Sequence, residues 1–314
     1  MTSNLFRNVF ILLSVIVFLP GCIYEDMQSC TEKSDLRFFY TMNPENKDLL
    51  GETVSRIDVY IFDKDGIYIG KKTSTEGQGN NQFPISLDLP DGIYDFLSVG
   101  YQNPYFMIGV FDPLKANMQF DEGLIAGKST LKDFRLKAEY KQNIFFPLPV
   151  GNLLRGNLIR QELPVKGKTS LHVSMIQFKN QLNISVKGLD FPGYHPVLYA
   201  NNGRYDFENN IPSDARTKIY ETQTQSIGET CQFDVLRLIE HHKIEFALVD
   251  QEGNRMPGIT PVNLIELIQK SPSYASQEDL DREHTYNIEL NYHQSVIVGI
   301  TINGWETIQV KPEM

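Results

Sequence analysis

The chain has 314 residues, of which 41% are hydrophobic, and it carries a formal net charge of -10. This hydrophobic fraction is enough to build proper cores, and it excludes a chain that is disordered throughout. An acidic chain of this kind is not expected to bind nucleic acid or to lie flat on anionic lipid, because both select basic surfaces.

The first segment of the chain predicts export. A short polar start holding Arg7 precedes Val9–Cys22, VFILLSVIVFLPGC, which has the composition of a secretory signal and is too short to span a bilayer comfortably. Its end, Leu19-Pro20-Gly21-Cys22, resembles the lipobox of bacterial lipoproteins, in which the cysteine thiol is joined to a diacylglyceryl group before cleavage. We therefore predict a signal peptide over residues 1–21, lipidation of Cys22 and a lipidated linker over residues 22–34. The alternative is a plain signal peptide with a chance cysteine.

The linker offers two further expectations. The acidic pair in Ile23-Tyr24-Glu25-Asp26 resembles the export signal that sends some Bacteroidales lipoproteins to the outer face of the outer membrane, and a solvated linker is the alternative. If Cys22 carries lipid, Cys30 and Cys231 are the cysteines that remain in a potentially oxidising compartment. A disulfide between Cys30 and Cys231 and two separate thiols are both open.

After the linker the chain has the patterns of β-structure. Arg56–Phe62 alternates strictly, with Ile57, Val59 and Ile61 facing one way, and Asp63-Lys64-Asp65-Gly66 then predicts a hairpin turn. Residues 104–128 show no clear period, so we expect a long loop or insertion there. The other strands expected in this half lie at residues 36–40, 67–69, 83–89, 93–101, 130–138 and 143–146.

The second half continues in the same way. We place a domain boundary near residue 160 because Leu163–Lys168 has linker chemistry, which gives domains of residues 35–160 and 161–314. Pro192–Asn210 predicts an exposed loop carrying a short hairpin, and Pro261–Lys270 is the clearest helix after the signal. Turns every eight to twelve residues are typical of β-sandwiches. Further strands are expected at residues 169–178, 182–186, 216–222, 231–239, 243–249, 285–290, 295–302 and 305–310, the last two joined by an Asn303-Gly304 turn.

Several fragments suggest a catalytic or metal site and fail on spacing. Gly127-Lys128-Ser129 lacks the first glycine of a phosphate-binding loop, and Asp63-Lys64-Asp65-Gly66 lacks the glutamate that closes a calcium loop. His241 and His242 would point to opposite faces of a strand, so one ion cannot easily take both. We therefore predict no catalytic residue, no metal ligand and no cofactor, and an enzyme is disfavoured.

The order of several motifs resembles a known family. The lipobox cysteine and acidic residues are followed by Cys30, the Arg56–Phe62 strand with its turn, and Leu89–Tyr94, LPDGIY. Near the end come Leu280-Asp281-Arg282-Glu283 and Ile302-Asn303-Gly304-Trp305. This arrangement resembles the FimB-type fimbrial anchor lipoproteins of Bacteroidales, including the anchors of major and minor fimbriae. The resemblance implies an all-β fold with few short helices and two tandem transthyretin-like β-sandwich domains. It also implies a surface-exposed lipid anchor in the outer membrane and a place at the base of a fimbrium, with fimbrillin-like stalk subunits as partners.

The resemblance further implies assembly by strand donation, in which a sandwich edge accepts an added strand. Stalk subunits of such fimbriae are thought to lose their first strand by proteolysis, whereas any cut after Cys22 would sever this body from its lipid. We therefore expect the chain to keep its first strand, to end growth at the membrane and to act as donor through its C-terminal segment. The alternative is an ordinary hairpin that completes the second sandwich, with Trp305 in its core. The candidate donor residues are Val296, Ile300, Ile302, Trp305 and Val310.

A second function class remains open. Surface glycan-binding lipoproteins of nutrient-uptake systems also combine a lipidated cysteine with β-sandwiches, and they bind sugar on aromatic platforms. This chain has 15 Tyr and one Trp, a composition that disfavours a flat carbohydrate platform. A hydrolase outside the cytoplasm is the third class, and the absence of a catalytic motif disfavours it.

Overall fold

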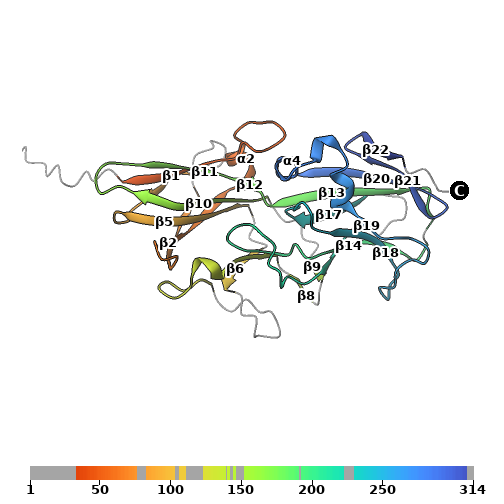
Figure 1. Ribbon diagram of the computed structural model, residues 1–314, viewed down its shortest axis with the longest axis horizontal. Helices are drawn as coiled ribbons and strands as arrows, with labels where there is room; N and C mark the ends of the chain where they lie inside the picture. The colour runs from red at the N-terminus through yellow and green to blue at the C-terminus, as the bar shows by residue number, and fades with distance from the viewer. Residues whose placement is uncertain are drawn as a thin grey trace, which may run out of the picture.

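The computed structural model describes residues 33–75, 83–102, 106–110, 123–138, 140–141, 144–145, 152–190, 192–222 and 230–309. They form an elongated molecule with β1 near one end of the long axis and β21 near the other end (Figure 1). The predicted fold class is confirmed, because strands dominate and form two β-sandwiches. The described helices and 3-10 turns are short: α2 (Leu50–Thr53), η1 (Leu131–Asp133), α3 (Leu264–Ile268), η2 (Pro272–Tyr274) and α4 (Gln277–Arg282).

The first sandwich contains β1 (Ser34–Phe39), β2 (Arg56–Phe62), β3 (Tyr68–Ser74), β4 (Ile85–Leu87), β5 (Gly92–Tyr101), β10 (Leu153–Leu163), β11 (Ser170–Ser174) and β12 (Ile176–Gln177). One sheet has the order β11-β1-β4, and the other has the order β12-β10-β5-β2-β3. The core between them includes Leu36, Phe38, Ile57 and Val173. The strand predicted at residues 36–40 is therefore the central strand of the smaller sheet.

The second sandwich contains β8 (Tyr140–Lys141), β9 (Ile144–Phe145), β13 (Lys179–Lys187), β14 (His195–Ala200), β16 (Lys218–Glu221), β17 (Cys231–Leu236), β18 (Ile244–Val249), β19 (Val262–Asn263), β20 (Thr285–His293), β21 (Val296–Ile302) and β22 (Trp305–Gln309). Its sheets have the orders β17-β13-β20-β21-β22 and β19-β18-β14-β16-β9-β8. Apolar side chains from both sheets, such as Leu182, Phe246 and Ile288, form its core, and α3 and α4 contribute Leu264 and Leu280.

A third layer covers the second face of the larger sheet of the first sandwich. It consists of β6 (Phe106–Val110), β7 (Phe134–Ala138) and β15 (Arg204–Tyr205), in the order β15-β7-β6. Ile57, Val59 and Ile61 of β2 face one core, as the alternation predicts. Tyr60 and Phe62 face a separate cluster with Phe134 and Tyr205, so β2 is buried on both faces.

Strand pairing divides the chain differently from the predicted boundary. Leu163–Lys168 leads from β10 in one sheet of the first sandwich to β11 in the other sheet of the same sandwich, and Gly167 there has φ 91°. β11 pairs with β1 and β12 pairs with β10, so the division falls near residue 178 rather than 160. In addition, β9 pairs with β16, so a segment from the first half completes the second sandwich.

Two predicted loops contain strands. Residues 104–128 include β6, which pairs with β7, and the expectation of a purely irregular insertion is wrong there. Pro192–Asn210 includes β14 and β15, and Tyr205 is fully buried rather than exposed. The strands in both segments are short, between two and six residues, and too short to give a clear period.

The predicted turns agree better with the structure. Gly66 has φ 73° in the β2–β3 turn, and Asn303 and Gly304 have φ 46° and 84° between β21 and β22. Positive φ at both central positions is what a type I′ hairpin requires, and Asn-Gly satisfies it with little strain. The helix predicted at Pro261–Lys270 is present but shorter, as α3.

Asp58 of β2 gives a prediction about pH. Burial raises the pKa of this carboxyl, but hydrogen bonds from Arg56, Thr73 and Lys71 outweigh burial, so the net pKa is lowered. Tyr101 donates a further hydrogen bond of 3.1 Å. A lowered pKa in the folded state stabilises the fold above the unfolded value of about 3.9, and the stabilisation is lost as the pH falls through the folded pKa.

We expect Asp58→Asn to lower the free energy of unfolding at pH 7 by about 1.5–3 kcal/mol, because charge-assisted hydrogen bonds are lost. Urea unfolding of both proteins at pH 7 and pH 3 measures this, and the difference between them should shrink at pH 3. A difference that is the same at both pH values would contradict the prediction.

Candidate functional site: the first strand, the joint and the C-terminal edge

The described chain begins at Lys33, beside a hollow at the end of the first sandwich. The hollow is lined by Ser34, by Leu87–Asp91 of the β4–β5 turn and by Leu163–Gly167 of the connection from β10 to β11. Its lining contains no aromatic side chain, so it lacks the stacking surface with which many sugar sites hold their ligand. Cys22 and Cys30 lie outside the described residues, and lipidation of Cys22 stays a prediction.

The position of Cys231 bears on the predicted disulfide. Cys231 is buried at the start of β17 and pairs with Ile184 of β13, whereas Asp35 of β1 pairs with Ser170. The extended run from Ser170 to Ile184 spans about 45 Å at about 3.3 Å per residue. Cys30 precedes Asp35 by five residues, a reach of at most about 18 Å. These lengths favour two separate thiols over a Cys30–Cys231 bond within one chain.

β1 is held on both sides. Asp35–Phe39 runs parallel to Ser170–Ser174 of β11, and Ser34–Leu36 runs antiparallel to Ile85–Leu87 of β4. Leu36 and Phe38 are 0% and 2% exposed in the core. The backbone groups and apolar side chains of β1 are therefore used within the chain's own sandwich.

The residues after β1 are fixed by a buried amide. Asn43 is fully buried, and its Nδ2 donates to the carbonyls of Tyr40 at 2.8 Å and Lys47 at 2.7 Å. The Asp48 carboxylate accepts from the backbone N–H groups of Tyr40 and Leu50. These bonds satisfy backbone groups that a loop would otherwise leave unpaired, and they hold the end of β1 in place.

The C-terminal hairpin is formed as predicted, but its residues differ in environment. Ile300 and Ile302 of β21 are 1% and 0% exposed, so β21, which lies between β20 and β22, is an integral strand of the second sandwich. Val296 is half-exposed, and Trp305 at the start of β22 is 71% exposed rather than part of the core. Val310 lies outside the described residues. Among the strands that the structure describes, β22 pairs with β21 alone and forms the edge of its sheet.

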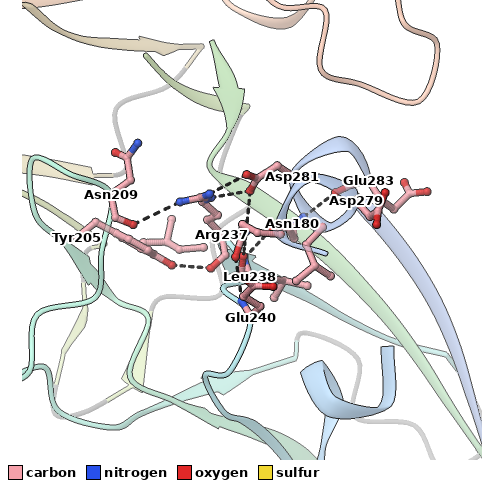
Figure 2. A network of polar contacts seen from close by, with 12 residues as sticks. Asn180, Tyr205, Asn209, Arg237, Leu238, Glu240, Asp279, Asp281 and Glu283 are labelled. Atoms are coloured by element: carbon pink, nitrogen blue, oxygen red, sulfur yellow. Dashed lines mark hydrogen bonds and ion pairs between the residues drawn. The ribbon is translucent and has the colours of Figure 1, made fainter. Parts of the chain in front are cut away.

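Figure 2 shows a polar network at the joint between the two sandwiches. Arg237, just after β17, donates from Nε and Nη2 to the two carboxylate oxygens of Asp281 at 2.6 and 2.7 Å, and both side chains are nearly buried. Asn180 of β13 accepts from the N–H of Leu238 and donates to the carbonyl of Glu283. The network fixes α4 to β13 and β17.

The sequence forms α4 locally. Ser276 precedes the helix, and its hydroxyl accepts from the N–H of Asp279 while the Asp279 carboxylate accepts from the N–H of Ser276. This reciprocal capping box satisfies the first backbone donors of the helix. The hydrogen bond from the Ser276 hydroxyl is the largest cause that lowers the pKa of Asp279. Asp281 then lies on the face of α4 that contacts Arg237.

The loop after β15 joins the two sandwiches. On one side, the Tyr205 hydroxyl donates to the carbonyl of Arg237 at 2.6 Å, and Arg237 Nη1 donates to the carbonyl of Asn209 (Figure 2). On the other side, Arg155 and Asn157 of β10 donate to the carbonyls of Asp206 at 3.0 Å and Phe207 at 2.6 Å. The loop therefore contacts strands of both bodies, and the joint is a packed interface.

Arg155 is a fully buried cation at this joint. Its guanidinium lies between the rings of Phe134 and Phe178, at 5.2 and 5.0 Å from their centroids. Burial lowers the pKa of Arg155 to about 9, and the charge of Asp206 opposes that shift. The side chain still carries its charge at neutral pH, where two aromatic faces and one carbonyl stabilise it.

Sequence reasoning missed Arg155, Arg237 and Asp281 as structural residues. The available signal was a charged residue inside an apolar run, in Leu153-Leu154-Arg155 and in Leu236-Arg237-Leu238. Such a residue is rarely buried without a partner, but the sequence does not identify that partner.

The described residues hold no group of three or more His, Cys, Asp or Glu side chains placed to bind a metal ion. Within the same residues, no helix is long and apolar enough to cross a membrane.

Comparisons with known proteins agree with this architecture. The minor fimbrium anchoring subunit Mfa2 of Porphyromonas gingivalis is 24% identical over 95% of this chain and 94% of its own length. Among solved structures, the fimbrial anchor protein Mfa2 of P. gingivalis has a TM-score of 0.71 at 20% identity and covers 88% of this chain and 99% of its own. A putative polysaccharide-binding protein of Bacteroides thetaiotaomicron has a TM-score of 0.72 at 22% identity, over 89% and 98% of the two chains. The family model for fimbrillin-A associated anchor proteins Mfa1 and Mfa2 matches residues 27–311, and the chain therefore belongs to that family.

Proposed function

We propose that this chain is an outer-membrane lipoprotein, acylated at Cys22, that anchors a fimbrium to the cell surface and ends its growth. Membership of the anchor family supports the fimbrial role. Cys22 precedes Lys33 by eleven residues, a reach of at most about 40 Å, so the first sandwich stays close to the membrane. Each buried methylene of an acyl chain contributes about 0.8 kcal/mol, and two or more chains hold stably.

The observation that carries the proposal is the position of β1. A subunit that accepts a donated strand needs an open groove with unpaired backbone groups and exposed apolar pockets. Here β1 fills that position between β11 and β4 with Leu36 and Phe38 buried. With β1 retained, the groove is closed to a donor, and the chain ends the row of subunits at the membrane.

We further propose that the chain joins the stalk by donating its C-terminal strand. The burial of Ile300 and Ile302 limits the donor to β22 and the residues after it, because release of β21 would expose the core. β22 is suited to release since it has one neighbouring strand among those described and begins with the exposed Trp305.

Replacing Cys22 by alanine tests the anchor. The variant is expected to be lost from the outer-membrane fraction and to appear as a soluble protein, because the thiol that accepts lipid is gone. Fractionation followed by immunoblotting measures the distribution, with Cys30→Ala as the matched control that should stay in the membrane. Retention of both variants in the membrane would sink the lipid-anchor proposal.

Truncation after Gly304 tests strand donation. We expect the truncated protein to fold but no longer to co-purify with stalk subunits. Trp305→Ala alone should also leave the fold intact. The melting temperature and co-purification are measured together. Global unfolding of the truncated chain would instead assign β22 to the ordinary hairpin that completes the second sandwich.

Glycan binding is the competing function. The hollow beside Lys33 lacks aromatic side chains, so the exposed Trp305 is the aromatic side chain on which a sugar would have to stack. A sugar array probed with the wild-type protein and Trp305→Ala separates the two functions: a signal lost in the variant would favour the glycan-binding function.

A further inference from the structure

A long extended run of the chain crosses the joint. β11, β12 and β13 follow one another from Ser170 to Lys187, interrupted at Met175 and Phe178, and we call Ser170–Lys187 the spine. Figure 1 shows β12 and β13 passing from the first sandwich to the second. Met175 and Phe178 are buried, so the interruptions are packed into cores rather than left as hinges. The spine is a covalent connection along the long axis.

Each end of the spine pairs with a parallel strand. In the first sandwich, β1 runs parallel to β11 from Asp35 opposite Ser170 to Phe39 opposite Ser174. In the second sandwich, β20 runs parallel to β13 from Thr285 opposite Gln181 to Asn291 opposite Lys187. β1 and β11 therefore begin side by side at the same end of the molecule, which is the end nearest Cys22 in the chain.

This arrangement determines how tension acts on β1. A pull on the N-terminus draws β1 along its own axis, while the spine holds β11 back from its opposite end through β12 and β13. The hydrogen bonds of a strand ladder lie roughly across the strands, so such a pull loads all of them together instead of one after another. The ladder includes the flanking bonds from Asp35 N–H to Thr169 and from Met175 N–H to Phe39.

Sliding β1 along its axis would also break its pairing with β4 and expose its buried side chains. β4 holds Ser34–Leu36 from the other edge, so two ladders must break together. Leu36 and Phe38 would leave a core in which they are almost fully buried. A one-residue slip would turn these side chains to the wrong face, so no intermediate register relieves the load.

We propose that β1 and the spine form a tension-bearing link, strong when the N-terminus is pulled against the second sandwich and weak when β1 is peeled from β11 at their shared end. The use of this link in the cell rests on the proposed anchor function. The resistance to force is a property of the isolated protein. A test on purified protein can therefore fail or succeed independently of the proposed anchor function.

The test is single-molecule pulling of the mature chain in two geometries. One handle is fused directly before residue 23 and takes the place of Cys22, and Cys30 is replaced by serine. The second handle is attached at His293→Cys, the last residue of β20 in the second sandwich, or at Lys166→Cys, in the connection from β10 to β11 beside the start of β1. Both substituted side chains are exposed, and the buried Cys231 reacts slowly with thiol reagents. Matching melting temperatures show that both variants fold.

We expect unfolding with the His293→Cys handle to require a severalfold higher force than with the Lys166→Cys handle at the same pulling speed, since forced unfolding follows the unfolding rate along the pulled direction. The Lys166→Cys trace should begin with the short extension of β1 alone. Equal forces in the two geometries, or a lower force with the His293→Cys handle, would overturn the proposal. Neither result depends on whether Cys22 carries lipid.

Discussion

Replacing Phe38 by alanine is expected to lower the free energy of unfolding by about 3–5 kcal/mol, the range for a large side chain removed from a close-packed core. Phe38 is 2% exposed and lies in the cluster with Leu36, Ile57 and Val173. The cavity would form between the two sheets of the first sandwich, at the centre of the smaller sheet. Because β1 is flanked on both sides, the smaller sheet cannot close over the loss without breaking a ladder. Urea unfolding measures the change.

Arg37→Ala is the matched control on the neighbouring position. The Arg37 side chain is more than half exposed, and its ion pair with Asp35 at 3.6 Å lies at the surface. Its removal should change the free energy of unfolding by less than about 1 kcal/mol. If the effects of Phe38→Ala and Arg37→Ala were similar, β1 would not have the central, buried position on which the closed groove depends.

Replacing Asp281 by alanine is expected to have a comparable effect at the joint. The substitution leaves Arg237 with a buried charge and no carboxylate, and breaking such a pair costs about 3–5 kcal/mol. Gln277 also loses an acceptor, since its Nε2 donates to Asp281 at 2.9 Å. α4 should loosen from β13 and β17. The free energy of unfolding and hydrogen exchange of the α4 amides measure the two parts of the effect.

Two further variants show where that energy comes from. Arg282→Ala removes a neighbouring cation of α4 whose pairs with Glu278 and Asp279 are exposed, and it should cost less than about 1 kcal/mol. The double variant Arg237→Met with Asp281→Leu replaces both charges by apolar groups and should be clearly more stable than Asp281→Ala alone. A double variant that is no more stable would show that the pair, rather than the unpaired charge, determines the loss.

Local patterns predicted much of the fold. The alternation of Arg56–Phe62 corresponds to β2, and Asn303-Gly304 forms the predicted turn between β21 and β22. Both signals depend on residues that are close to each other in the sequence. The expected strands at residues 93–101 and 295–302 also correspond closely to β5 and β21. In both cases a turn signal adjoins the pattern, Pro90-Asp91-Gly92 before the first strand and Asn303-Gly304 after the second.

The layers could not be predicted in the same way. Nothing in Arg204-Tyr205 indicates that this short strand pairs with β7, some 70 residues earlier, or that Tyr205 is fully buried. The predicted boundary near residue 160 fails for a similar reason: Leu163–Lys168 has the composition of a linker, but it leads into β11, whose partner β1 lies at the start of the chain. Non-local pairing decides both cases, and composition does not encode it.

The C-terminal donor segment shows the same limit. Val296, Ile300, Ile302 and Trp305 look equivalent as an apolar pattern, yet two are buried in β21 and Trp305 is exposed at an edge. The alternative of an ordinary hairpin expected Trp305 in the core of the second sandwich. Its exposure follows from its place at the start of β22, the edge strand of its sheet in the described part of the chain.

We propose that one acylated chain holds each fimbrium at the cell surface. Electron microscopy of the wild type and of Cys22→Ala, with fimbriae counted on cells and in the medium, tests this directly. The account predicts that the Cys22→Ala strain assembles fimbriae and releases them into the medium, with the protein at one end of each fibre. Fimbriae that remain attached to Cys22→Ala cells in wild-type numbers would contradict it.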